Sequence, residues 1–146
     1  MKYTINKLTS GEEELILNYV KESPEIEKII SFMQNKHKKI CGKTDGETVI
    51  VDPEEILYIE TVDDKTFAYT MDKTIRLEAT LAGIQKQLED VKFFRCSKSM
   101  IVNVDRVERL KSLPSNRIDA VIQSGEHIMI SRTYASEFRR LLREVR

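Results

Sequence analysis

A chain of 146 residues, 40% of them hydrophobic, can bury one main core but not two large ones. Charged residues make up 33% and cancel to a net charge of zero, which excludes a uniform polycation. The charges are unevenly distributed, however, because positions 1–92 hold 13 Lys+Arg against 18 Asp+Glu, whereas positions 93–146 hold 11 against 6. The basic C-terminal part favours an anionic partner, unless it merely balances the acidic part within one neutral surface.

Positions 1–36 are expected to form a small N-terminal segment. Residues 2–8 alternate polar with apolar and end at the turn signal "TSG", so we predict a short strand. Residues 12–20 fit a helix or a strand, and the alternation of Leu15, Leu17 and Tyr19 favours a strand. Positions 23–36 predict a helix that is capped by Ser23 and has one apolar face, formed by Ile26, Ile29, Ile30 and Met33. That face can pack on the segment's own strands or contribute to a dimer contact.

From position 38 onwards the pattern predicts a mainly β domain with a few helices, an α+β fold overall. Turn signals at 45–46, 63–64 and 71–73 separate short apolar segments with β-hairpin spacing. A helix capped by Thr80 is predicted over 80–90, followed by strands at 107–113, 117–123 and 127–130. Residues 133–146 predict a final helix whose apolar face comprises Tyr134, Phe138, Leu141 and Leu142.

No pattern indicates catalysis, a cofactor or a metal, so we expect a protein that is not an enzyme. His37 and His127 lie in no triad or metal-ligand spacing, and Glu54 and Glu55 are better explained by a turn after Asp52 and Pro53. The two cysteines, Cys41 and Cys96, have no neighbouring ligands for zinc. Cys96 is either a buried strand cysteine or a redox sensor whose pKa is lowered by Arg95 and Lys98.

The N-terminus has no apolar signal region, and no apolar run approaches the ~18 residues that span a bilayer. The expected compartment is therefore the cytoplasm, where thiols stay reduced.

Nucleic-acid binding is better supported by the residue types near the predicted turns. The cationic side chains there suit phosphates, and the polar ones can read base edges; the candidates are Lys65, Thr66, Arg95, Ser97, Lys98, Ser99, Asn103, Arg132 and the terminal arginines. The alternative is that these side chains are ordinary solvated surface. The sequence shows neither an aromatic platform for single strands nor a helix-turn-helix spacing in the basic part.

The region from about Lys38 to Arg146 resembles the LytTR family of bacterial DNA-binding domains. The resemblance is carried, in order, by "VDPEEILYIETVDDKTFAYT" at 51–70, "FFRCSKSMIVNVDRVERL" at 93–110 and "GEHIMISRTYASEFRRLL" at 125–142. It implies a fold of about ten short strands that places loops between strands into successive grooves of double-stranded DNA. It thereby accounts for the absence of a helix-turn-helix.

The resemblance also implies which positions contact DNA. The loop after the "IE" strand holds Lys65 and Thr66, the segment after "FFR" holds Ser97 and Lys98, and the final "SR" turn holds Arg132. An arginine at the last place can pair bidentately with guanine. Asn103 matches a family motif residue but can also be structural, fixing a turn by bonding to the backbone.

Two departures from the family pattern limit what the resemblance implies. In redox-controlled members, the cysteine at the Cys96 position has a partner cysteine that aligns near His127. This chain has no cysteine there, which argues against redox switching. The segment at 1–36 replaces the receiver domain of many members, so the resemblance implies a standalone transcriptional regulator. Such a regulator is expected to bind promoter repeats as a homodimer and to be controlled by a membrane-bound protein. The alternative is a protein-interaction module or anti-activator that retains the fold.

Overall fold

A computed structural model describes residues 1–34, 39–88 and 93–144, and the chain divides into two compact units, Met1–His37 and Lys38–Arg146. The first unit contains helix α1 (Pro24–Met33), as the sequence predicts. The Ser23 hydroxyl accepts a hydrogen bond from the Ile26 amide at 3.2 Å and caps the helix. Residues 35 and 36 of the predicted helix lie outside the described residues.

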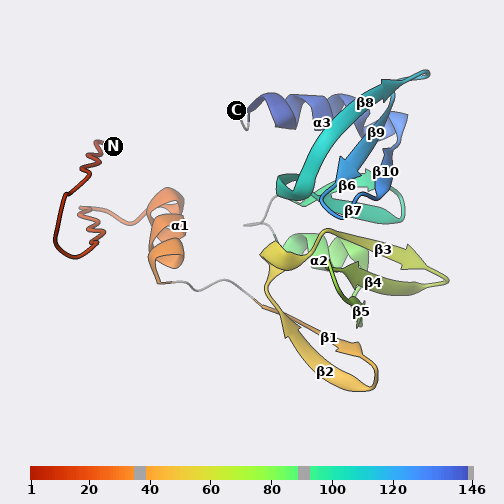
Figure 1. Cartoon of the computed structure of the whole chain (residues 1–146), viewed down its shortest axis with the longest axis horizontal. Coiled ribbons are helices and arrows are strands. Elements are labelled where there is room, and N and C mark those ends of the chain that lie inside the picture. The colour runs from red at the N-terminus through yellow and green to blue at the C-terminus, as the bar shows by residue number, and fades with distance from the viewer. Residues whose placement is uncertain (35–38, 89–92, 145–146) are drawn as a thin grey trace. The chain divides into compact units, whose positions relative to one another are not determined.

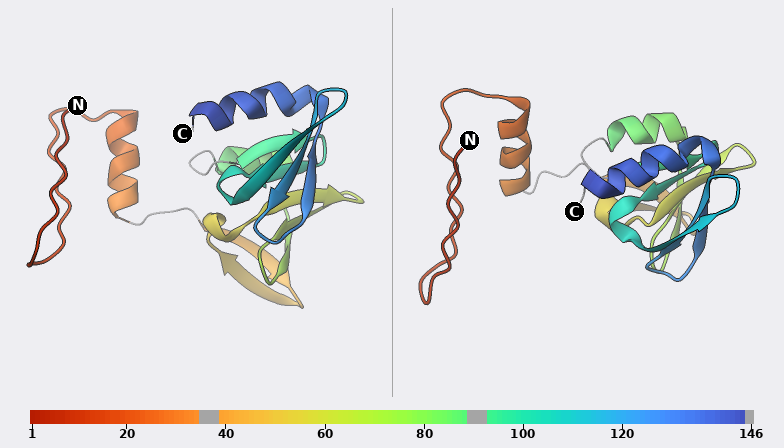
Figure 2. Two further views of the ribbon diagram at one scale, coloured as in Figure 1. Left: turned by 45° about the horizontal axis from the view of Figure 1, so that its top comes forward. Right: turned by 90° about the horizontal axis from the view of Figure 1, so that it is seen from above.

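The strands predicted at 2–8 and 12–20 are not formed, which corrects the prediction. Both segments are extended arms that run side by side (Figure 2), but neither is assigned to a strand. Alternation is a real feature of these residues, yet a two-stranded ribbon is marginal in water unless a third strand or a packed face supports it.

The described residues of the second unit form ten short strands, which confirms the predicted mainly β, α+β fold (Figure 1). The strands are β1 (Ile40–Thr44), β2 (Glu47–Val51), β3 (Tyr58–Val62), β4 (Lys65–Tyr69), β5 (Thr74–Leu77), β6 (Phe93–Ser97), β7 (Met100–Asn103), β8 (Val107–Leu113), β9 (Arg117–Ile122) and β10 (His127–Ile130). The helices are α2 (Leu81–Gln87) and α3 (Arg132–Glu144), and the short 3-10 turns are η1 (Pro53–Glu55) and η2 (Val104–Arg106).

The predicted turns and helices of this unit are confirmed. The turn at 45–46 joins β1 to β2 and the turn at 63–64 joins β3 to β4, both with positive φ at each central residue, as tight hairpins require. Thr80 caps α2 through a 3.1 Å hydrogen bond from the Gly83 amide. Helix α3 begins at Arg132, one residue before the predicted start. The predicted helical positions 89–90 and 145–146 lie outside the described residues.

Seven strands form one antiparallel sheet in the order β2-β1-β5-β4-β3-β7-β6, and the other three form a sheet in the order β10-β9-β8. The antiparallel pairing of β1 with β5 is short and aligns one residue pair, Lys43 with Arg76. A Cβ atom at Gly42 would lie 2.8 Å from the Arg76 carbonyl oxygen, so this close crossing of β1 over β5 requires a glycine.

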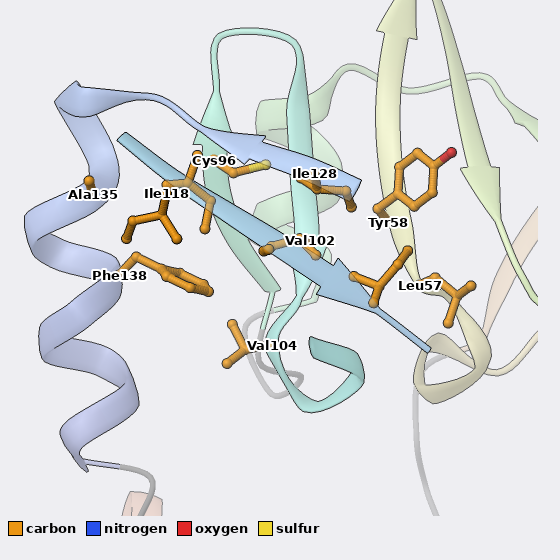
Figure 3. Close-up of a cluster of buried hydrophobic side chains, with 12 residues drawn as sticks. Leu57, Tyr58, Cys96, Val102, Val104, Ile118, Ile128, Ala135 and Phe138 are labelled. Carbon is orange, nitrogen blue, oxygen red and sulfur yellow. The ribbon is translucent and has the colours of Figure 1, made fainter. Parts of the chain in front are cut away.

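The large sheet separates two hydrophobic clusters because alternate residues of each strand point to opposite faces. On one face, Ile59 and Ile101 pack with Leu81 and Ile84 of α2. On the other, Tyr58 and Val102 join the small sheet and α3, whose Phe138 is fully buried (Figure 3). The apolar face predicted for the last helix is thus confirmed, since Phe138 is buried and Tyr134, Leu141 and Leu142 pack around the same cluster.

Candidate nucleic-acid interface

Three segments that are distant in sequence meet at one end of the second unit: the β3–β4 turn, the β6–β7 turn and the start of α3. The Thr61 amide of β3 donates to the Ser99 carbonyl at 2.8 Å, which holds the first two turns together. The Ser131 amide donates to the Cys96 carbonyl at 2.9 Å, which holds the start of α3 against β6. In Figure 1 the two turns and the start of α3 lie on the same side of the unit. The three segments that carry Lys65, Lys98 and Arg132, the cations predicted from the sequence, therefore lie on one side of the second unit.

The β3–β4 turn presents Lys65 but not Thr66. Asp63 and Asp64 have φ values of 50° and 62°, which form the tight turn and leave Lys65 exposed directly after it. Thr66 is only 5% exposed, and its hydroxyl lies 3.5 Å from the hydroxyl of Thr61 on the paired strand. Successive residues of a strand point to opposite faces, so only Lys65 of this pair is available to a ligand.

The β6–β7 turn is shaped by the side chain of Arg95. Its Nε donates to the Ser97 carbonyl at 2.8 Å and its Nη2 donates to the Lys98 carbonyl at 2.5 Å. The Ser97 hydroxyl accepts from the Ser99 amide at 3.3 Å. Arg95 and Ser97 therefore serve the turn itself. Lys98 and Ser99 are both exposed, and Lys98 is the cation that the turn presents.

Arg132 lies at the start of α3, where the carbonyl of Ser131 accepts hydrogen bonds from the amides of Tyr134 and Ala135, both at 3.0 Å. The helix is anchored to the sheet by Phe138, whose ring centroid lies 5.1 Å from that of Phe94. Arg132 itself is exposed and has no hydrogen-bond or ion-pair partner in the described part of the chain. The backbone at the start of α3 is thus fixed, and the guanidinium donors of Arg132 are available to a ligand.

Asn103 is 1% exposed, and its side chain bonds to the backbone on both sides. Nδ2 donates to the Ile56 carbonyl at 2.9 Å, and Oδ1 accepts from the Asp105 amide at 3.1 Å, capping η2. This arrangement confirms the structural role that the sequence allowed for Asn103. A side chain with this burial and these bonds does not present a free group to DNA.

Part of the arginine excess in the C-terminal third is structural, which the charge distribution did not reveal. Arg106 donates from Nε and Nη2 to the Glu54 carbonyl at 2.9 and 2.7 Å, and from Nη1 to Gln123 at 2.9 Å. Arg139 donates to Asn116 at 2.5 Å and to Ser112 at 3.4 Å. Only the tertiary contacts separate these arginines from Arg132.

Asp63 and Asp64 are indicated by the sequence only as turn residues, but the structure places them at the candidate interface. Asp63 and Asp64 are exposed and directly precede Lys65, so their carboxylates lower the positive potential of the β3–β4 turn. The positive φ of both residues explains why aspartate is found there, since aspartate tolerates this conformation better than most residues.

The other candidate chemical groups have structural surroundings. His127 is exposed on β10, and its Nδ1 lies 2.9 Å from Oδ2 of Asp119 on the neighbouring strand. Glu54 and Glu55 belong to η1 after Asp52 and Pro53, as predicted. His37 lies outside the described residues. No group of three or more His, Cys, Asp or Glu side chains that could hold a metal occurs within residues 1–34, 39–88 and 93–144.

Cys96 is buried in the cluster around Phe138, as one of the two readings of the sequence predicted. Burial raises the pKa of its thiol to about 12, and this effect exceeds the lowering by neighbouring Arg95. The thiol donates a hydrogen bond to the Met100 carbonyl at 3.3 Å. The preferred reading, a buried strand cysteine, is therefore confirmed, and the alternative of a thiol activated by Arg95 and Lys98 is not supported.

We expect Cys96 in the folded protein to resist alkylation at neutral pH, whereas the exposed Cys41 reacts. The protein should also lose stability as the pH rises from 9.0, the ordinary pKa of the thiol, towards 12, because over that range the unfolded chain ionises Cys96 and the folded chain does not. Mass spectrometry after alkylation and unfolding measured against pH check both statements. Cys96→Ala is the control, and equal pH dependence in this variant would contradict the second.

A small β domain that gathers lysine and arginine side chains from strand-connecting turns is suited to binding the nucleic-acid backbone and base edges. The comparison with known families agrees, because the model of the LytTr DNA-binding domain matches residues 46–143. The chain belongs to the LytTr DNA-binding domain family. The domain that defines this family binds DNA and is not a catalytic domain.

Relatives and a solved structure support this assignment. The chain is 30% identical over 135 residues to the sensory transduction protein LytT of Bacillus subtilis (strain 168), which covers 90% of this chain and 56% of that protein. It is 26% identical over 108 residues to an uncharacterised HTH-type transcriptional regulator of Staphylococcus aureus (strain NCTC 8325 / PS 47), covering 74% of this chain and 73% of that one. The solved LytTr DNA-binding domain from Bacillus cereus superposes with a TM-score of 0.67 at 28% identity and covers 71% of this chain and 95% of that one.

The match to the LytT proteins is partial in length, since the chain spans about half of the Bacillus subtilis protein. The family match at 46–143 falls within the second unit and leaves α1 and the two arms outside it. None of the described helices is long and apolar enough to cross a membrane.

Proposed function

We propose that the second unit binds double-stranded DNA sequence-specifically and that the protein is a cytoplasmic transcriptional regulator. The observation that carries this proposal is the pair of backbone hydrogen bonds, Thr61 to Ser99 and Ser131 to Cys96, which assemble the three family contact segments into one surface. Lys65 and Lys98 contact phosphates from the two turns. Arg132 reads a guanine edge in the major groove, because a guanidinium can donate to O6 and N7 together.

Arg95 and Ser97 contribute to this site by positioning. The Arg95 guanidinium uses two donors on the carbonyls of residues 97 and 98, so it holds Lys98 at the tip of the turn. Thr66 and Asn103 support the site from within the sheet. Two copies of the protein on repeated half-sites contact successive major grooves, and control by a membrane-bound protein stays a prediction of the family resemblance.

Salt dependence tests the proposal. Two to three neutralised phosphates per copy predict that affinity for promoter DNA falls roughly 10- to 40-fold per copy between about 50 and 200 mM salt. Fluorescence anisotropy with labelled duplexes, identified by selection from a genomic DNA pool, measures this fall. Lys65→Gln and Lys98→Gln should each reduce the slope of log affinity against log salt by about 1 per bound copy on any sequence.

A flat salt response, or no binding to any selected duplex, would favour the alternative function, a protein-interaction module that keeps the fold. Arg143→Gln is the matched control, since Arg143 is exposed near the other end of α3, away from the three contact segments.

A further inference from the structure

The two arms of the first unit, residues 2–8 and 12–20, have backbone groups without partners. Both arms are extended, and in the described part of the chain no backbone hydrogen bond involves any residue from 1 to 22. An extended segment with unpaired N–H and C=O groups is a template for pairing with another strand. The arms therefore have no hydrogen-bonded strand partner among the described residues of this unit.

The apolar side chains of the arms are also uncovered. Tyr3, Ile5 and Leu15 are 83%, 86% and 66% exposed. Odd-numbered positions of an extended arm share one face, so each arm has an apolar face that is open to solvent. Helix α1 reaches the far end of the second arm, where Leu17 is half-buried beside Ile30. Among residues 1–34 only Ile26 is buried, so the single helix covers a small part of the apolar face.

The same unit carries the complementary surface. Phe32 of α1 is 68% exposed, whereas Ile30 and Met33 of the same helix lie towards the second arm. A hollow of about 270 Å³ opens between that arm and the helix, lined by Leu17, Tyr19, Ile30, Met33 and Gln34. Uncovered apolar arms together with an exposed aromatic on the helix suit an isologous contact, in which each copy provides both surfaces.

We propose that the first unit is a dimerisation module. The arm at 12–20 pairs with the same arm of a second copy of this chain, and α1 of each copy covers the exposed arm face of the other. The apolar side chains that would be covered have areas of order 150–200 Å² each and are about two thirds or more exposed, so six of them supply roughly 800 Å² per partner, the size of a stable interface. The required area is therefore present within this unit.

The charges of the second arm fit pairing with its own copy. In an antiparallel pair centred on Ile16, Glu12 lies opposite Val20 and Glu14 lies opposite Asn18. No two of the acidic side chains in this arm face each other, and like charges directly opposite would destabilise the pair. The exposed Ile16 lies at the two-fold axis of this arrangement.

Analytical ultracentrifugation of the full chain without DNA tests the inference, so its result does not depend on the DNA-binding proposal. We expect the wild-type chain to be a dimer, and Phe32→Glu and Leu15→Lys to raise the dissociation constant at least about 100-fold, because each places two charges in an apolar interface. Both residues are exposed in the single chain, so the variants should fold normally.

The matched controls add the same charges at neighbouring exposed positions, Ser31→Glu and Asn18→Lys. Ser31→Glu should leave the dissociation constant unchanged, and Asn18→Lys should leave it unchanged or lower it, because the new ammonium would lie opposite Glu14. A wild-type chain that stays monomeric at about 100 µM would overturn the inference. A dimer that all four substitutions weaken equally, or none weakens, would also overturn it.

Discussion

Arg132→Ala is expected to lower the affinity for a selected DNA site by about 1–3 kcal/mol, roughly 5- to 150-fold, and to relax the base preference at one position of that site. The expectation follows from the geometry, because Arg132 is exposed at the start of α3, next to β6, with its donors unused in the described part of the chain. Its removal should leave the free energy of unfolding unchanged. Anisotropy titrations against the selected duplex and its single-base variants give both the loss and the change in preference.

Two comparisons make the Arg132 experiment decisive. Arg143→Ala removes the same charge near the other end of α3 and should change affinity much less. Lys98→Gln should weaken binding to specific and random DNA alike, because a phosphate contact carries no base information. If Arg132→Ala also weakens both kinds of DNA equally, Arg132 contacts phosphate and the base-reading role is wrong.

Asn103→Ala is expected to destabilise the protein by about 3 kcal/mol. The change leaves the buried Ile56 carbonyl without its 2.9 Å bond, removes the acceptor that caps η2 at the Asp105 amide, and opens a small cavity. Chemical unfolding of both proteins measures the difference. At a temperature where the variant remains folded, its base preference should equal that of the wild type, since the side chain is not exposed to DNA.

Gln123→Ala is the matched control for Asn103→Ala. The side-chain oxygen of Gln123 accepts a 2.9 Å hydrogen bond from Arg106, but at the exposed surface, so its loss should cost less than about 1 kcal/mol. A normal stability for Asn103→Ala combined with altered base preference would show that Asn103 reads DNA after all.

Much of the fold could be predicted because its signals are local. Tight hairpin turns were expected at 45–46 and 63–64, and the positive φ angles at these positions are the property that aspartate and glycine tolerate. Ser23 and Thr80 were expected to cap helices, and both hydroxyls accept amide hydrogen bonds. These signals depend on neighbours within four residues, so the sequence shows them directly.

The candidate site could be predicted only as a set of segments. The stretch from Phe93 to Val107 mixes polar and apolar residues that look alike in sequence, yet the structure assigns them different places: Arg95 bonds to its own turn, Cys96 is buried, Lys98 is exposed and Asn103 is inside. Whether a polar side chain faces water or the interior depends on which distant strand covers that face. Residue type does not reveal this.

By itself, the sequence determined the order of strands and helices in the second unit, the family and the three segments that carry the candidate contacts. Only the tertiary structure decided which side chains of those segments are available, through the backbone bonds of Thr61 to Ser99 and of Ser131 to Cys96. It also decided that the arms at 2–8 and 12–20 do not form strands, since alternation predicts a strand only where a partner completes the ladder. The physical reason is the same in both cases, because contacts between residues far apart in the chain are set by packing and not by local pattern.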